Sequence, residues 1–217
     1  MTKKQSAMRI ADIVLNFACF VMVAVSVSMF FVRGGSGNMD VVGAKAFRYY
    51  TVDSNILLGV ASLVVAISGL MRLRSGKPLP KAVVLLKFCG TCVVLITFFT
   101  VIVFLGPVFG FAGMYANQSL YLHGVVPVLA ALTLLILERG TEFSAWESLL
   151  SLIPTALYGT VYFIMVLAVG RENGGWEDFY GFNMGDRWIL SVAVMGLAAA
   201  GLALLLRALY RIGRKKK

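Results

Sequence analysis

Hydrophobic residues in this chain fall into six long runs separated by short polar stretches. Each run has 18 to 24 residues, and a helix needs about 20 mostly apolar residues to cross a bilayer. No run shows the period-two alternation that is typical of membrane β-strands. The pattern therefore predicts six spans, at Ile10–Val32, Thr51–Met71, Ala82–Leu105, Leu120–Leu137, Ser148–Val169 and Trp188–Leu206.

Composition supports this interpretation. The chain has 217 residues, of which 59% are hydrophobic and 14% are charged, whereas soluble domains have about 45–50% apolar and about 25% charged residues. A water-soluble globule and a disordered chain are both excluded. Six spans leave little chain for another folded unit. We predict an all-α membrane protein, with residues 1–217 forming a single integral membrane domain built as a six-transmembrane-helix bundle.

Basic residues predict the orientation of the bundle. The two ends of the chain and the second and fourth loops would share one side, and they hold 14 of the 20 Lys and Arg residues. The loops on the opposite side hold five, and Lys87 lies inside the third span. Since basic loops stay in the cytoplasm, we expect a multi-pass protein of the cell membrane with both termini cytoplasmic. The first span is expected to be retained, because its apolar run is too long for a signal peptide.

The net charge of +10 mostly reflects this asymmetry. Six basic residues end the chain, Arg207, Arg211, Arg214, Lys215, Lys216 and Lys217. We expect this tail to contact anionic lipids of the inner leaflet, in addition to the membrane lipids around the bundle. A nucleic acid is not an expected partner.

Several residues inside the spans are expected to serve packing alone. Cys89 and Cys92 form a C-x-x-C motif, but a thiol oxidoreductase would also need cysteines in outer loops, where this chain has none. No cofactor and no metal ion are expected. Small residues line one face of two spans, which lets helices approach closely. They are Gly59, Ser62, Ala66 and Gly69 on the second span and Gly196, Ala200 and Ala203 on the sixth.

Two ionisable side chains lie within spans, where each is costly unless it is paired. Asp12 and Lys87 both lie toward the expected cytoplasmic ends of their helices. A structural ion pair between them is the favoured interpretation. The alternative is that Lys87 extends to the inner headgroups.

The second span begins with a cluster of polar residues, Tyr50, Thr51, Asp53, Ser54 and Asn55. Thr, Asp and Ser are preferred at helix starts, and Asp53 also suits the helix dipole. Capping thus accounts for Asp53 or Ser54. It does not account for Asn55, which lies deeper and must be paired inside the bundle.

The fourth span begins with the only histidine of the chain, His123, followed by Gly124 and Pro127. A hydrogen-bonded interfacial histidine is one interpretation. However, the second and fourth spans run in the same direction, so Thr51 and His123 lie at a similar depth near the outer face. We therefore predict that His123 acts as general base on the Thr51 hydroxyl, with free amides at the helix start as an oxyanion hole.

The fifth loop lies on the same outer side and is rich in aromatic residues. Trp176 and Tyr180 fit either an interfacial anchor or a lid over an outer cavity. Glu177 or Asp178 is a candidate to orient His123. Pro154 predicts a kink in the fifth span that widens such a cavity.

These residues resemble one family of membrane proteins. The resembling segments are Tyr50–Leu57, His123 with Pro127, Pro154 with Tyr158, and Trp176–Phe182. They are similar to bacterial relatives of the androgen-induced-gene family, whose animal members are membrane threonine hydrolases that cleave fatty acid esters of hydroxy fatty acids. The resemblance implies a helical bundle with an acyl-chain cavity, Thr51 as nucleophile and His123 as base.

Three functions thus remain open from the sequence. The first is a lipid-ester hydrolase that uses Thr51 and His123 on a lipid-like substrate. The second is a transporter or small-molecule binding protein that uses Asp53, Asn55 and His123 as a polar site. The third is a structural protein in which Thr51 caps a helix and His123 binds a backbone carbonyl.

Overall fold

A computed structural model of the chain describes residues 2–32, 41–183 and 185–212. The described residues form helices joined by short loops and contain no β-strand. Six helical segments are long and apolar enough to cross a membrane, as expected from the hydrophobic runs. They cover Lys3–Val32, Tyr50–Met71, Lys81–Phe109, Gln118–Ile136, Ala145–Val169 and Trp188–Ile212.

The first span and the last span are single helices, and three of the other four are interrupted. The uninterrupted helices are α1 (Lys3–Val32), α2 (Tyr50–Met71) and α10 (Trp188–Ile212). The third span consists of α3 (Lys81–Thr100), the π-helical segment η2 (Val101–Leu105) and α4 (Gly106–Phe109). The fourth consists of α6 (Gln118–Leu120), the π-helical η3 (Tyr121–Val125) and α7 (Val126–Ile136). The fifth consists of α8 (Ala145–Leu149), α9 (Leu152–Phe163) and the π-helical η4 (Ile164–Val169).

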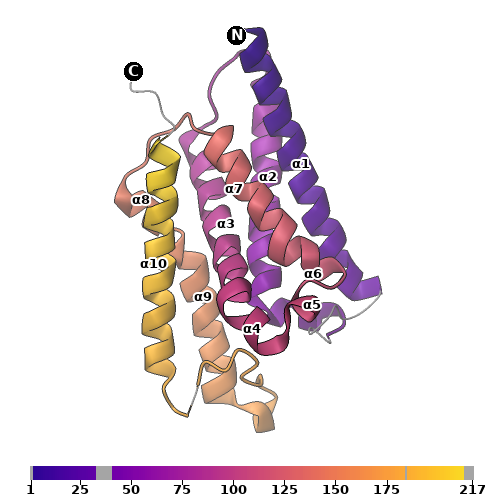
Figure 1. Ribbon diagram of the computed structural model, residues 1–217, viewed down its shortest axis with the longest axis vertical. Helices are drawn as coiled ribbons and strands as arrows, with labels where there is room; N and C mark the ends of the chain where they lie inside the picture. The colour runs from indigo at the N-terminus through magenta and orange to yellow at the C-terminus, as the bar shows by residue number, and fades with distance from the viewer. Residues whose placement is uncertain (1, 33–40, 184, 213–217) are drawn as a thin grey trace.

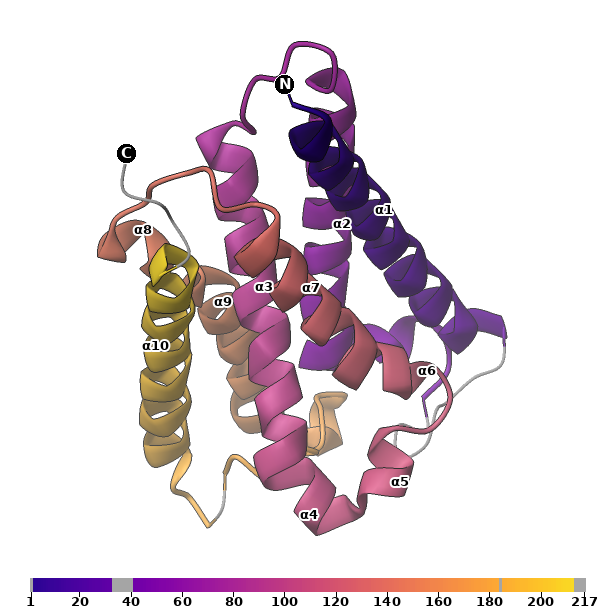
Figure 2. The ribbon, with the colours of Figure 1, turned by 45° about the horizontal axis from the view of Figure 1, so that its top comes forward.

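The start of α1 and the end of α10 lie at the same end of the bundle (Figure 1), which we call the terminal end. The opposite end, where α2 begins, is called the far end. Residues 213–217 lie outside the described residues, so of the predicted basic tail only Arg207 and Arg211 are placed. The view turned forward shows α1, α2, α3 and α7 side by side, with α9 and α10 beside α3 (Figure 2).

Buried apolar side chains form three clusters along the helices. At the terminal end Phe88 packs with Leu134 and Tyr210, and in the middle Val23 packs with Leu58. The small-residue face of α2 lies against α1, as predicted: a Cβ on Gly59 would lie 3.1 Å from Val23. Gly196 of α10 differs, because a Cβ there would meet nothing within 4 Å.

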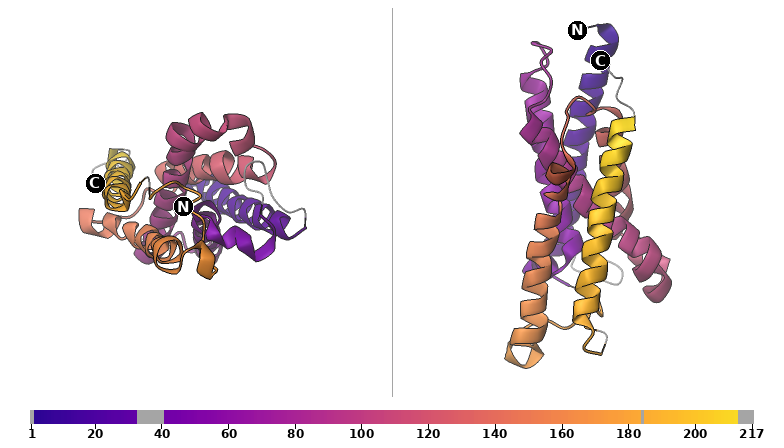
Figure 3. Two further views of the ribbon diagram at one scale, coloured as in Figure 1. Left: turned by 90° about the horizontal axis from the view of Figure 1, so that it is seen from below. Right: turned by 90° about the vertical axis from the view of Figure 1, so that its left-hand side faces the viewer.

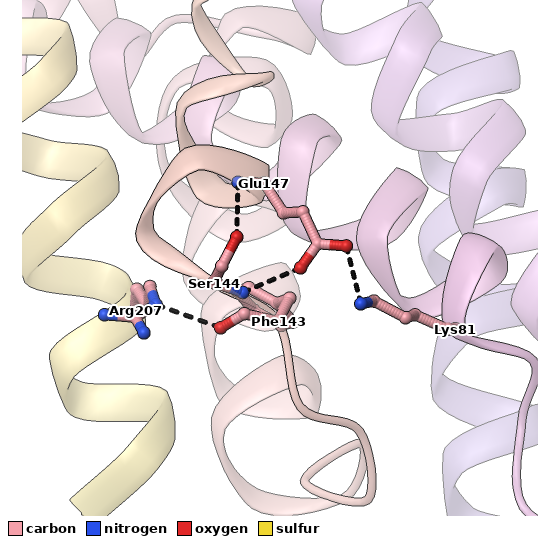
Figure 4. A network of polar contacts seen from close by, with 5 residues as sticks. All are labelled: Lys81, Phe143, Ser144, Glu147 and Arg207. Atoms are coloured by element: carbon pink, nitrogen blue, oxygen red, sulfur yellow. Dashed lines mark hydrogen bonds and ion pairs between the residues drawn. The ribbon is translucent and has the colours of Figure 1, made fainter.

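The pair α9 and α10 is tied to the rest at the terminal end by polar contacts (Figure 4). Ser144 and Glu147 form a capping box at the start of α8, and Glu147 also pairs with Lys81 of α3. Arg207 of α10 donates to the Phe143 carbonyl at 3.1 Å. Toward the far end α9 and α10 lie side by side (Figure 3). A cavity lies among these two helices, α2 and α3.

Candidate functional site

The far-end cavity has a volume of about 480 Å³ and lies among α2, α3, α9 and α10, within the range of small-molecule sites. Most of its wall is apolar, with Ile96, Leu152 and Met195 as examples. Its polar lining consists of hydroxyl side chains, contributed by Tyr50, Thr51, Thr97, Thr100, Thr155, Tyr158, Thr160, Tyr162 and Tyr180. Such a surface suits an apolar chain that carries a few hydrogen-bonding atoms.

Thr51 lies in the first turn of α2 and is 6% exposed, at the wall of this cavity. Its carbonyl accepts hydrogen bonds from Ser54 Oγ at 3.1 Å and Asn55 Nδ2 at 2.8 Å. The structure gives no hydrogen-bond acceptor for the Thr51 N–H among the described residues. The hydroxyl and a free helix-start amide therefore occur on the same residue.

His123 lies in η3 and is buried. Its Nδ1 lies 2.6 Å from the Met114 carbonyl oxygen. A carbonyl only accepts, so Nδ1 carries the hydrogen, and the neutral ring keeps Nε2 as its proton acceptor. The π-helical turn has a local cause, since Pro127 has no N–H to donate to the preceding turn, and Val126 N–H bonds Tyr121 O instead.

Asn55 joins the segments of Thr51 and His123. Its Nδ2 donates to the Thr51 carbonyl and, at 3.1 Å, to the carbonyl of Leu122, the residue before His123. The predicted pairing of Asn55 inside the bundle is confirmed. The two helix starts lie at the same level, but no hydrogen bond joins the Thr51 and His123 side chains in the described part of the chain, and His123 is not among the described residues that line the cavity.

The start of α2 is not capped by its own side chains. The N-cap residue is Tyr49, whose side chain makes no capping bond. Instead the Tyr50 N–H donates to the Tyr180 hydroxyl at 3.0 Å, so the fifth loop caps this helix. Asp53 is half-buried, and its carboxylate has no hydrogen-bond partner among the described residues. Ser54 also lies 3.2 Å from the Thr97 hydroxyl of α3.

The fifth loop covers one side of the far-end cavity with Tyr180 and Phe182. The Asp178 carboxylate holds the loop in shape, since it accepts from the Tyr162 hydroxyl at 2.7 Å and from the Phe182 N–H at 2.9 Å. Trp176 is held by its backbone N–H, which donates to the Met165 carbonyl at 3.0 Å.

The loop therefore does not supply the expected partner of His123. Glu177 pairs with Arg171 at 3.0 Å, and Asp178 is occupied within the loop. The Met114 carbonyl orients the ring instead. Burial within the loop raises the pKa of the Tyr180 hydroxyl, so this group stays neutral.

The elbow that holds Met114 was not anticipated from the sequence. After α4 the chain turns at Gly110, whose φ of +87° favours glycine, and forms α5 (Phe111–Met114) before α6. The signals were Gly106, Gly110 and Gly113 around Pro107, a composition typical of turns. Without tertiary contacts these residues do not reveal that the elbow folds back onto His123.

The break expected at Pro154 occurs one turn earlier. Helix α8 ends at Leu149 and α9 begins at Leu152, because Pro154 cannot donate to the carbonyl four residues before it. Leu152 and Thr155 beyond the break line the cavity, and Thr155 lies 2.7 Å from the Tyr50 hydroxyl.

Known proteins offer no further guide to this site. Comparisons with protein families, with characterised proteins and with solved structures find no match to the chain. The resemblance to the androgen-induced-gene family therefore rests on the residues quoted for it.

Proposed function

We propose that this chain is an integral membrane hydrolase that cleaves a lipid ester, with both termini in the cytoplasm and its site near the outer membrane face. The observation that carries the proposal is the position of Thr51. Its side chain lines an apolar cavity, while Asn55 connects its backbone to the segment that contains His123. The fatty acyl chain of a lipid ester, such as a fatty acid ester of a hydroxy fatty acid, matches the apolar wall.

In the proposed reaction the Thr51 hydroxyl attacks the ester carbonyl carbon while His123 Nε2 accepts the hydroxyl proton. The Thr51 N–H is positioned to bind the developing oxyanion. His123 then returns the proton to the departing alcohol, and water hydrolyses the acyl-threonine. The reaction needs the two side chains to approach, directly or through one water, when substrate binds.

A second function, lipid binding or transport without chemistry, is favoured by the position of His123 outside the cavity lining. In that case Tyr50 and Thr155 would bind the polar group of the ligand, and no bond would be cleaved. A hydrolase would release fatty acid from the ester, whereas a binding protein or transporter would leave the ester intact.

The test is hydrolysis by the purified full-length protein in lipid nanodiscs, with a fatty acid ester of a hydroxy fatty acid as substrate. We expect release of free fatty acid by the wild type, no release by Thr51→Ala, and wild-type release by Thr91→Ala. Thr91 is a matched control, because it is a buried span threonine whose hydroxyl donates to the Lys87 carbonyl of its own helix. Binding of the ester without release would support the second function.

A further inference from the structure

A second group of polar side chains is buried at the terminal end. It consists of Asp12 and Asn16 on α1, Ser62 on α2, Lys87 on α3 and Glu138 after α7, and we call it the terminal cluster. Each of these residues is at most 6% exposed. Polar groups at this depth need partners, and the partners come from three helices and from the loop after α7.

The two carboxyl groups of the cluster lie close together. Asn16 Nδ2 donates to Asp12 Oδ1 at 2.9 Å and to Glu138 Oε1 at 3.0 Å. Since both oxygens bond the same nitrogen, they are no more than about 6 Å apart. Two ionised carboxylates buried this close together repel each other, and a proton on one of them relieves the repulsion.

The expected Asp12–Lys87 ion pair is not formed. Among the described residues the ion pairs are Lys81–Glu147 and Arg171–Glu177. Lys87 Nζ instead donates to Ser62 Oγ at 2.8 Å, because the α2 hydroxyl faces it directly. The Lys87 charge still acts on Glu138 through space.

The charges around the pair leave one carboxyl without a compensating cation. Helix α3 provides Lys87, α2 provides the neutral Ser62, and α10 provides the Tyr210 hydroxyl, which donates to the Glu138 carbonyl at 2.7 Å. Arg9 of α1 lines the same cavity as the two carboxyl groups, but its guanidinium donates to the carbonyls of residues 72 and 77. One carboxylate is thus balanced by Lys87, and burial raises the pKa of Glu138.

A cavity of about 450 Å³ at the terminal end reaches this pair. Asp12 and Glu138 contribute to its lining together with Gln5, Ser75 and Thr141. Two buried acceptors of the cluster, Asn16 Oδ1 and Glu138 Oε2, have no hydrogen-bond partner among the described residues. Unpaired buried acceptors next to a polar cavity leave room for a hydrogen supplied by water or, at a carboxylate oxygen, by a bound proton.

We propose that Asp12 and Glu138 form a proton-binding site that exchanges one proton with the cavity at the terminal end of the bundle. A hydronium ion in the cavity gives its proton to one carboxylate oxygen and leaves as water, and release reverses this step. No oxidant or further reactant is needed. The site is separate from the far-end cavity and does not depend on the proposed hydrolysis.

The experiment is an infrared titration of the full-length protein in lipid nanodiscs, which follows the carbonyl stretch of protonated carboxyl groups from acidic to alkaline pH. We expect one such band to persist above the pH at which exposed carboxyls ionise, and to shift on transfer to D2O because the cavity admits water. Glu138→Gln or Asp12→Asn should abolish or shift it. Glu172→Gln, which alters an exposed loop carboxyl, should leave it unchanged.

Carboxyl-labelled glutamate and aspartate keep the test decisive if either amide variant fails to fold. In the wild type, ¹³C labelling of one of these residue types should move the band. The proposal is overturned if all aspartate and glutamate side chains ionise in the normal acidic range, or if the band does not shift in D2O. It is also overturned if the band remains in the Asp12→Asn/Glu138→Gln double variant.

Discussion

The two ends of the bundle bury polar groups in different ways. At the terminal end Asp12, Lys87 and Glu138 are buried together, and hydrogen bonds from Asn16 and to Ser62 hold them across helices. At the far end Thr51 and Tyr50 line an apolar cavity. Charge in a membrane interior demands partners, whereas a hydroxyl tolerates an open cavity. Access to apolar space, rather than burial of charge, therefore distinguishes the candidate reaction site from the terminal cluster.

The largest effect is expected from removing the hydroxyl that faces the far-end cavity. Thr51→Ala should lower ester hydrolysis by about 10⁶-fold, as loss of the hydroxyl nucleophile does in serine hydrolases. Thr51→Ser keeps the hydroxyl and should retain measurable turnover. If Thr51→Ala and Thr51→Ser lose activity equally while circular dichroism shows both to be folded, the Thr51 hydroxyl is not the reacting group of the far-end cavity.

Breaking the terminal cluster should affect stability more than activity. Lys87→Ala leaves a buried carboxylate uncompensated, which costs about 3–5 kcal/mol. Lys81→Ala is the matched control, because the Lys81–Glu147 pair is half exposed and contributes under about 1 kcal/mol. Reversible unfolding in SDS measures both. Equal losses for the two lysine variants would remove the distinction between a buried cluster and a surface pair.

Filling the far-end cavity should change which acyl chains are accepted. Gly159 lines the cavity, and a Cβ there would meet nothing within 4 Å, so Gly159→Leu projects into free space. We expect about a 10-fold loss with long-chain esters and a smaller loss with short-chain esters. Gly201→Leu is the control, since Gly201 is exposed on α10 and does not line the cavity. If Gly159→Leu hydrolyses long-chain and short-chain esters in the same ratio as the wild type, the acyl chain does not bind in this cavity.

The smallest effect concerns the loop that caps α2. Tyr180→Phe removes the acceptor of the Tyr50 N–H and should cost about 1 kcal/mol. Hydrogen exchange at the first amides of α2 should accelerate, while amides in the middle of α1 keep their protection. Tyr121→Phe, at an exposed position, should change neither.

The six spans were predictable because hydropathy depends only on local composition. The helices extend beyond the predicted runs, as at Lys3 of α1, since polar residues continue a helix once it leaves the apolar region. The matched level of the Thr51 and His123 segments followed from counting spans. The buried pairing of Asn55 followed from its depth in the span.

Contacts between distant residues were not predictable. Asn16 donates to Glu138 across more than a hundred residues, and Tyr180 caps a helix that begins at Tyr50. These contacts depend on how each helix is rotated about its axis and on where a loop packs. A hydropathy profile contains neither the rotation of a helix nor the packing of a loop. The sequence therefore predicted an ion pair of Lys87 with Asp12, whereas Lys87 bonds Ser62.

The most direct test of the central claim is covalent labelling of the full-length protein in nanodiscs with a fluorophosphonate probe, followed by mass spectrometry to locate the adduct. We expect an adduct on Thr51 that is lost in Thr51→Ala and in His123→Ala and is retained in Thr91→Ala. No adduct, or an adduct that survives in Thr51→Ala, would contradict it.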